Sequence, residues 1–216
     1  MMDAMGQSRP RDSPAILVAT GGTIAVLTTV ALLHLLKPEL DPASRFISEY
    51  AIGQFGWVMK LSFVAWAASC LALSVAVRPA VTNRRGRAGA WLLAVVGIAL
   101  ILAGIFPQDP VTITPDQATT SGMMHAFASM VGIPGVPIAA LLILAGLPAA
   151  RRYRMRIATH ATWICLALMI AYLAYAVPRA GGFNPTVLAG WMNRLVVASY
   201  LAWQLLLARS LSRVTQ

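Results

Sequence analysis

The stretch RFISEYAIGQFGWVMK, residues 45–60, is the part of the chain from which the rest is best interpreted. Read as a single helix, it has spacings that place four residues on one face: Glu49, Gly53, Gly56 and Lys60. That face carries an acid and a base at its two ends and glycines between them, where a neighbouring backbone can come close. The residues after Gly56 are apolar enough to enter a bilayer. The stretch therefore predicts a polar helix face that leads from the aqueous edge into a membrane.

The composition favours an integral membrane protein. Hydrophobic residues make up 58% of the 216-residue chain and charged residues 11%, far from the averages of soluble domains. A formal net charge of +10 would indicate nucleic acid as the partner of a soluble domain. Here the arginines flank apolar runs and have a simpler role as orientation signals. We therefore expect the lipid bilayer as a partner and no nucleic acid.

Six apolar runs are long enough to cross the hydrocarbon core of a membrane. They predict an all-α integral membrane bundle of six transmembrane helices, with spans at about 14–36, 56–77, 91–106, 122–147, 157–177 and 191–208. We expect residues 1–13 to be a disordered cytoplasmic N-terminus and residues 209–216 a cytoplasmic tail. The first run lacks an A-x-A cleavage pattern, so it is expected to remain as a span.

The distribution of basic residues predicts the orientation of the bundle. Twelve arginines fall on the side of the two termini, including the segments RPAVTNRRGR (78–87) and RRYRMR (151–156). The opposite side has five basic residues and five of the seven acids. Because short loops rich in Lys and Arg remain in the cytoplasm, we expect a multi-pass protein of the cell membrane with both termini cytoplasmic.

Several ionisable residues fall at one depth near the outer boundary of the membrane. Counted from the inner arginines, Lys60 lies about 27 Å and Arg194 about 22 Å along its helix, within a core about 30 Å thick. His34, Asp109 and His125 reach a similar height. Intramembrane charges usually pair and face the bundle interior, so these groups predict a shared polar pocket. The alternative is that Lys60 and Arg194 extend to the headgroups.

Chemical roles follow from the residue types. Glu49 or Asp109 together with His125 could transfer protons, since histidine titrates near neutrality and a partly buried carboxyl group has a raised pKa. The candidate ligand-binding residues are Ser48, Lys60, Asn193 and Arg194. Of these, Lys60 and Arg194 would hold an anionic group such as phosphate or carboxylate.

The fourth span contains the segment VGIPGVP, residues 131–137. Each of Pro134 and Pro137 removes a backbone donor and clashes with the preceding turn, so we expect the helix to kink or break there. A broken helix often marks a substrate site in transporters. The prolines therefore leave two interpretations open: a structural kink, or a moving part of a small transporter.

Metal and cofactor chemistry has little support in the sequence. His34 and His125 could ligate a metal or a haem if their helices adjoin, but no accompanying pattern is visible, and His160 lies at the opposite face. Cys70 and Cys165 are expected to be small packing residues. We expect no metal site and no cofactor.

Three motifs together resemble the prokaryotic membrane family called domain of unknown function 998. They are SEYAIGQFGW (48–57) entering the second span, GIFPQDP (104–110) closing the third, and GMMHAF (122–127) opening the fourth. The resemblance extends across nearly the whole chain. It implies a six-helix membrane fold and carries no established activity. The family-like positions are Ser48, Glu49, Pro107, Asp109 and His125.

Three functions fit these observations. The leading hypothesis is a polar pocket, open to the outer leaflet, that binds a lipid-like or amphipathic small molecule and acts on it if the carboxylates and His125 meet. The second is a small transporter with a broken fourth helix. The third is a non-catalytic membrane subunit or scaffold, whose glycine stripe packs on a partner. The sequence leaves open whether the chain forms an oligomer.

Overall fold

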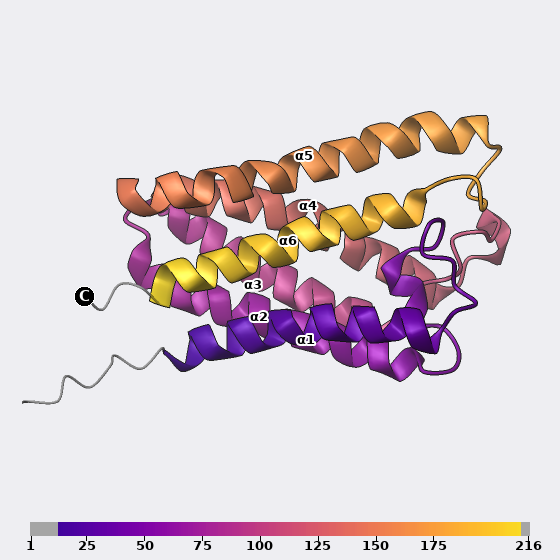
Figure 1. Cartoon of the computed structure of the whole chain (residues 1–216), viewed down its shortest axis with the longest axis horizontal. Coiled ribbons are helices and arrows are strands. Elements are labelled where there is room, and N and C mark those ends of the chain that lie inside the picture. The colour runs from indigo at the N-terminus through magenta and orange to yellow at the C-terminus, as the bar shows by residue number, and fades with distance from the viewer. Residues whose placement is uncertain (1–12, 213–216) are drawn as a thin grey trace, which may run out of the picture.

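The computed structural model describes residues 13–212. In this range the chain forms six long α-helices and no strand (Figure 1). They are α1 (Pro14–Leu36), α2 (Gly56–Val77), α3 (Arg84–Ile105), α4 (Thr120–Gly146), α5 (Ala149–Arg179) and α6 (Ala189–Ser212). All six are long and apolar enough to cross a membrane. The protein is therefore an all-helical, multi-pass membrane protein. The expectations for residues 1–12 and 213–216 lie outside the described residues.

Small residues set how closely the helices pack. α3 and α4 have the most extensive contact in the bundle. There, a Cβ atom added to Gly89 would lie 2.9 Å from the carbonyl oxygen of Ala139. Between α1 and α2, a Cβ atom on Gly22 would lie 2.5 Å from the carbonyl oxygen of Ala65. Glycine permits these backbone approaches, which is how helices associate where lipid removes the hydrophobic driving force.

A buried polar cluster joins three helices in the middle of the bundle. Thr23 of α1 and Ser69 of α2 share a hydrogen bond of 2.7 Å, and Ser69 also donates to the carbonyl oxygen of Ala19. Gln204 of α6 accepts from Thr23 and donates to the sulfur of Cys70. All these side chains are buried. Since an unpaired polar group is costly in hydrocarbon, the cluster fixes α1, α2 and α6 relative to one another.

Residues 45–60 are not a single helix, so the predicted common face of Glu49, Gly53, Gly56 and Lys60 is wrong. Ile47–Ala51 forms a short 3-10 helix, η1, and α2 begins only at Gly56. A turn separates them, in which Gly53 and Phe55 have φ angles of 68° and 60°. A Cβ atom on Gly56 would collide with the backbone of Ala51. The glycine thus permits the chain to fold back on itself, rather than approach another helix.

The helix α4 continues through Pro134 and Pro137 without a break. Pro137 has no N–H to donate to the carbonyl of Ile133 one turn earlier, but the Tyr200 hydroxyl donates to that carbonyl at 2.6 Å. The indole N–H of Trp163 donates to the carbonyl of Pro137 itself at 3.0 Å. The Tyr200 hydroxyl of α6 therefore replaces the donor that Pro137 removes, and the expected break is corrected to a continuous helix.

Two arginine-rich segments expected to be loops are helical instead. Asn83 caps α3 by accepting from the backbone N–H of Gly86 at 2.9 Å, so the helix already includes the arginines at 84, 85 and 87. The helix α5 begins at Ala149 and includes those at 151, 152, 154 and 156. Hydropathy marks only the part of a helix inside hydrocarbon, whereas the helix itself continues into water. Short 3-10 turns, η2 (Arg78–Ala80) and η3 (Pro115–Gln117), lie in the connecting segments.

Candidate functional site

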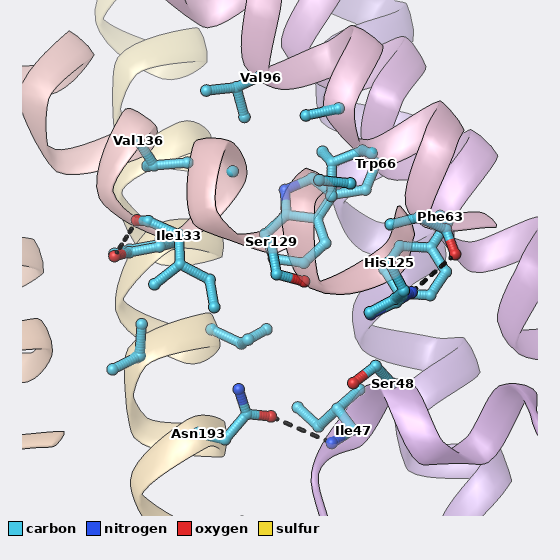
Figure 2. Close-up of a pocket in the computed structure, with 18 of the residues that line it drawn as sticks. Ile47, Ser48, Phe63, Trp66, Val96, His125, Ser129, Ile133, Val136 and Asn193 are labelled. Atoms are coloured by element: carbon cyan, nitrogen blue, oxygen red, sulfur yellow. Dashed lines mark hydrogen bonds between the residues drawn. The ribbon is translucent and has the colours of Figure 1, made fainter. Parts of the chain in front are cut away.

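A cavity lies inside the bundle, between α4 and α6 and against α2 and α3 (Figure 2). Its volume is about 80 Å³, enough for about six water molecules. The helices α4 and α6 hardly approach each other, although both pack on other helices. Most of the lining is apolar, for example Phe63, Leu100 and Val136. The space is therefore suited to a narrow apolar group.

Three of the predicted site residues line this cavity: Ser48, His125 and Asn193. The hydroxyl of Ser48 donates to the side-chain oxygen of Gln108. Asn193 accepts from the backbone N–H of Ile47 at 3.0 Å and so holds η1 against α6. In Figure 2, Ser48 and Asn193 lie near one end of the cavity and Val96 and Val136 near the other. Ser48 and Asn193 thus make the end formed by η1 polar.

His125 extends from α4 and is 3% exposed. Its Nδ1 lies 2.9 Å from the carbonyl oxygen of Phe106 and 3.1 Å from that of Ala103, at the end of α3. Its ring packs edge-on against Phe63, with the ring centroids 5.8 Å apart. The imidazole is therefore held rigidly by α2 and α3.

Lys60 and Asp109 line a different, open depression on the outer surface, together with Trp57 and Gln108. The carboxylate of Asp109 accepts from the backbone N–H and the hydroxyl of Thr119, both at 2.8 Å. Thr119 in turn caps α4 by accepting from Gly122. Asp109 thus stabilises the beginning of α4, where a negative charge complements the helix dipole.

Glu49 is buried among the connecting segments and does not line the cavity. Its carboxylate accepts from the backbone N–H of Phe46 at 2.9 Å and of Val111 at 3.3 Å, and pairs with Arg45 at 3.1 Å. Burial raises the pKa of this carboxyl group above its ordinary value, although the hydrogen bond from Phe46 and the charge of Arg45 act in the opposite direction. Glu49 therefore ties η1 to the segment that follows α3.

Arg194 uses its guanidinium group to fasten the end of the bundle at which η1 lies. It donates to Nε2 of His34 at 3.0 Å, to the carbonyl of Arg45 at 2.7 Å and to the hydroxyl of Tyr50 at 3.0 Å. A fourth hydrogen bond reaches the carbonyl of Gly190 in its own helix. With these partners, the guanidinium connects α6 to α1 and to η1.

The hypothesis of one shared cavity is therefore wrong for four of the seven predicted residues. Glu49, Asp109 and Arg194 hydrogen-bond to connecting segments and neighbouring helices, and Lys60 lies at the outer depression. No hydrogen bond joins His125 to either carboxylate among the described residues. His34 and His125 also contact different partners, Tyr50 and Phe63. Depth alone did not reveal which side of each helix these groups occupy.

Some cavity residues were missed by the sequence reasoning. The indole N–H of Trp66 is buried and has no hydrogen-bond partner among the described residues. Ser129, Gly132 and Tyr200 also line the cavity. A Cβ atom added to Gly132 would have no neighbouring heavy atom within 4 Å. A glycine inside a span was the available signal, because glycine costs about 1 kcal/mol relative to alanine in a helix.

Comparison with known proteins gives one result. The family model described as "Protein of unknown function (DUF998)" matches residues 19–210. Neither the curated proteins nor the solved structures give a significant match to the chain. The matched region contains all three motifs that resemble this family, from the SEYAIGQFGW stretch to GMMHAF. Because the match covers most of its length, the chain belongs to the DUF998 family.

Proposed function

We propose that this protein binds a lipid-like or amphipathic small molecule, with the apolar chain of that molecule in the cavity between α4 and α6. The observation that carries the proposal is the cavity itself, about 80 Å³ of mostly apolar space with Ser48 and Asn193 at one end. Interiors are normally packed with few voids larger than a water molecule. A space of this size is suited to one alkyl chain rather than to a two-chain lipid.

Access from the surrounding membrane is consistent with the burial pattern. Ser129, Gly132, Ile133 and Val197 line the cavity and are only partly buried. They come from α4 and α6, the two helices that hardly approach each other. An amphipathic molecule could therefore enter sideways from the bilayer, where it is already concentrated.

The proposal concerns binding rather than catalysis. Of the three residues predicted to be catalytic, only His125 lines the cavity. The transporter hypothesis depended on a broken fourth helix, and α4 is continuous. The scaffold hypothesis depended on a glycine stripe, and Gly53 and Gly56 do not share a helix face. No specific observation favours either alternative over binding.

Filling the cavity tests the proposal. The substitution Gly132→Leu places a side chain in the open space, whereas Gly21→Leu on α1 is a matched control, because a Cβ atom there also meets no neighbour within 4 Å and Gly21 lies outside the cavity. The probe is 1-decanol with a photoreactive diazirine near the end of its chain, added to protein in lipid nanodiscs. After illumination, labelled peptides are identified by mass spectrometry.

We expect labelling of α4 and α6 at the cavity in the wild type and in Gly21→Leu, and at least a tenfold loss in Gly132→Leu. Equal labelling of all three proteins, or labelling confined to residues that face lipid, would show that the chain does not enter the cavity. That result would overturn the proposed function.

A further inference from the structure

We propose that the depression lined by Lys60 and Asp109 binds the zwitterionic headgroup of a phospholipid, with its phosphate against Lys60 and a primary ammonium against Asp109. This site is separate from the cavity between α4 and α6, because no residue lines both. A phosphoethanolamine headgroup has the required pair of charges, whereas an anionic headgroup lacks the ammonium.

The depression lies where several segments of the chain meet, at the end of the bundle that contains η1. Its walls are the first turns of α2, the turn that precedes them, the segment after α3 and the beginning of α4. Its volume is about 420 Å³, whereas a water molecule occupies about 30 Å³ in the liquid. The space is therefore large enough for a whole headgroup rather than for a single ion.

Lys60 and Asp109 bring opposite charges to this depression but do not pair with each other. The ion pairs among the described residues include neither of them, and no described residue accepts a hydrogen bond from the ammonium of Lys60. A carboxylate has about four acceptor positions, and Thr119 fills two of those on Asp109. Both side chains can therefore bind a ligand that carries one charge of each sign.

The presence of both charges disfavours a ligand with a single charge. An anion attracted to Lys60 would share the depression with the carboxylate of Asp109, and like charges repel. A zwitterion instead meets an opposite charge at each of its ends. Gln108 adds a donor for the phosphate oxygens, because its side-chain oxygen accepts from Ser48 while its amide N–H₂ donates to no described residue.

Trp57 indicates that the headgroup belongs to a lipid rather than to a soluble molecule. It lies three residues before Lys60 in α2, so the two side chains share a helix face. Trp57 lines the depression and is 63% exposed. Exposed tryptophans gather at the membrane interface, beside the headgroups. A phospholipid whose headgroup fills the depression can therefore keep its acyl chains in the bilayer.

Native mass spectrometry of the protein in a non-ionic detergent tests the proposal. The probes are phosphatidylethanolamine, phosphatidylcholine and phosphatidylglycerol, each with two oleoyl chains and titrated separately. The quaternary ammonium of phosphatidylcholine cannot donate a hydrogen bond, and phosphatidylglycerol has no cation. For the wild type we expect phosphatidylethanolamine to bind about three- to tenfold more tightly than either, the effect of one hydrogen bond to a charged group at an open site.

Two substitutions assign the contacts, each with a control that makes the same charge change at the same end of the bundle. Lys60→Met should weaken phosphatidylethanolamine and phosphatidylcholine at least threefold, whereas Arg179→Met, outside the depression, should weaken neither. Asp109→Asn retains an oxygen that accepts from Thr119 but removes the charge. It should abolish the preference for phosphatidylethanolamine over phosphatidylcholine, whereas Asp116→Asn should retain it.

The outcomes are independent of those for the cavity. Gly132→Leu, which fills the cavity, should bind phosphatidylethanolamine as the wild type does, so the failure of one proposal leaves the other intact. Equal binding of the three lipids by the wild type, or unchanged binding after Lys60→Met, would overturn the headgroup site. Competition by glycerophosphoethanolamine, which has no acyl chains, at the concentration at which the lipid binds would overturn the assignment to a lipid.

Discussion

Single side chains hold the end of the bundle that contains η1, largely through hydrogen bonds to backbone atoms. Glu49 joins η1 to Val111, and Arg194 joins α6 to Arg45 and Tyr50. Both residues were predicted to act on a ligand because charged groups at membrane depth are costly without a role. In the structure they hydrogen-bond to backbone groups of the irregular segments that cover the bundle. Any buried connecting segment needs such partners, because its backbone N–H and C=O groups are costly when left unpaired.

Glu49 provides a prediction about pH. Burial raises the pKa of its carboxyl group, so the folded protein binds this proton more tightly than the unfolded chain does. Its contribution to stability is then fully present below the unfolded pKa of about 4.3 and is lost as the pH rises through the higher folded value. The substitution Glu49→Gln keeps a neutral side chain of the same shape at every pH.

Thermal unfolding of the two proteins between pH 4 and pH 8 in detergent checks this sign. We expect the wild type to lose stability relative to Glu49→Gln as the pH rises. The opposite trend, a wild type that gains on the variant with rising pH, would mean that the pairing with Arg45 outweighs the cost of burial.

At the scale of elements, α4 depends on α6 for one of its backbone hydrogen bonds. Because Pro137 cannot donate to the carbonyl of Ile133, Tyr200 does so at 2.6 Å. We expect Tyr200→Phe to lower the free energy of unfolding by about 1–3 kcal/mol, since it leaves a carbonyl inside a membrane-spanning helix without a donor. In a Pro137→Ala background the alanine N–H can donate instead, and the same substitution should cost clearly less.

The double-mutant cycle over Tyr200 and Pro137, measured by thermal or denaturant unfolding, isolates this coupling. Additive effects of the two substitutions would show that Tyr200 contributes only packing. Ser199→Ala is a neighbouring control on α6, because the hydroxyl of Ser199 bonds only within its own helix, to the carbonyl of Val196.

At the scale of the whole molecule, the charges separate towards opposite ends of the bundle. The beginning of α1 and the end of α6 lie at the same end of the bundle (Figure 1). The connections from α2 to α3 and from α4 to α5 lie there too, next to Arg78 and the arginines in the first turns of α3 and α5. The acids at positions 39, 41, 49, 109 and 116 belong to the connecting segments at the other end.

This arrangement predicts the orientation in the membrane, because segments rich in arginine remain in the cytoplasm. A reporter that is active only in the cytoplasm should be active when fused after Gln216, and one that requires export should be inactive there. A matched pair of fusions within residues 110–117 should give the reverse result. Activity of the exported reporter at Gln216 would overturn the predicted topology.

The sequence by itself determined the class of protein and the number of helices. The thickness of hydrocarbon requires about 20 apolar residues for each span, so the apolar runs could be counted before any packing was known. The three short motifs were likewise enough to indicate the family, since they retain their order along the chain.

Only the tertiary structure decided which polar groups meet. Depth follows from counting along a helix, but the side of the helix that a residue occupies depends on how the whole bundle is rotated and packed. His125 therefore reaches the cavity, whereas Asp109 and Glu49, at a similar level, accept hydrogen bonds from backbone N–H groups. The continuity of α4 also depends on a contact between distant residues, because the missing N–H of Pro137 is replaced by the hydroxyl of Tyr200, far along the chain. Contacts between residues distant in sequence cannot be obtained from local pattern, and the cavity is built entirely from such contacts.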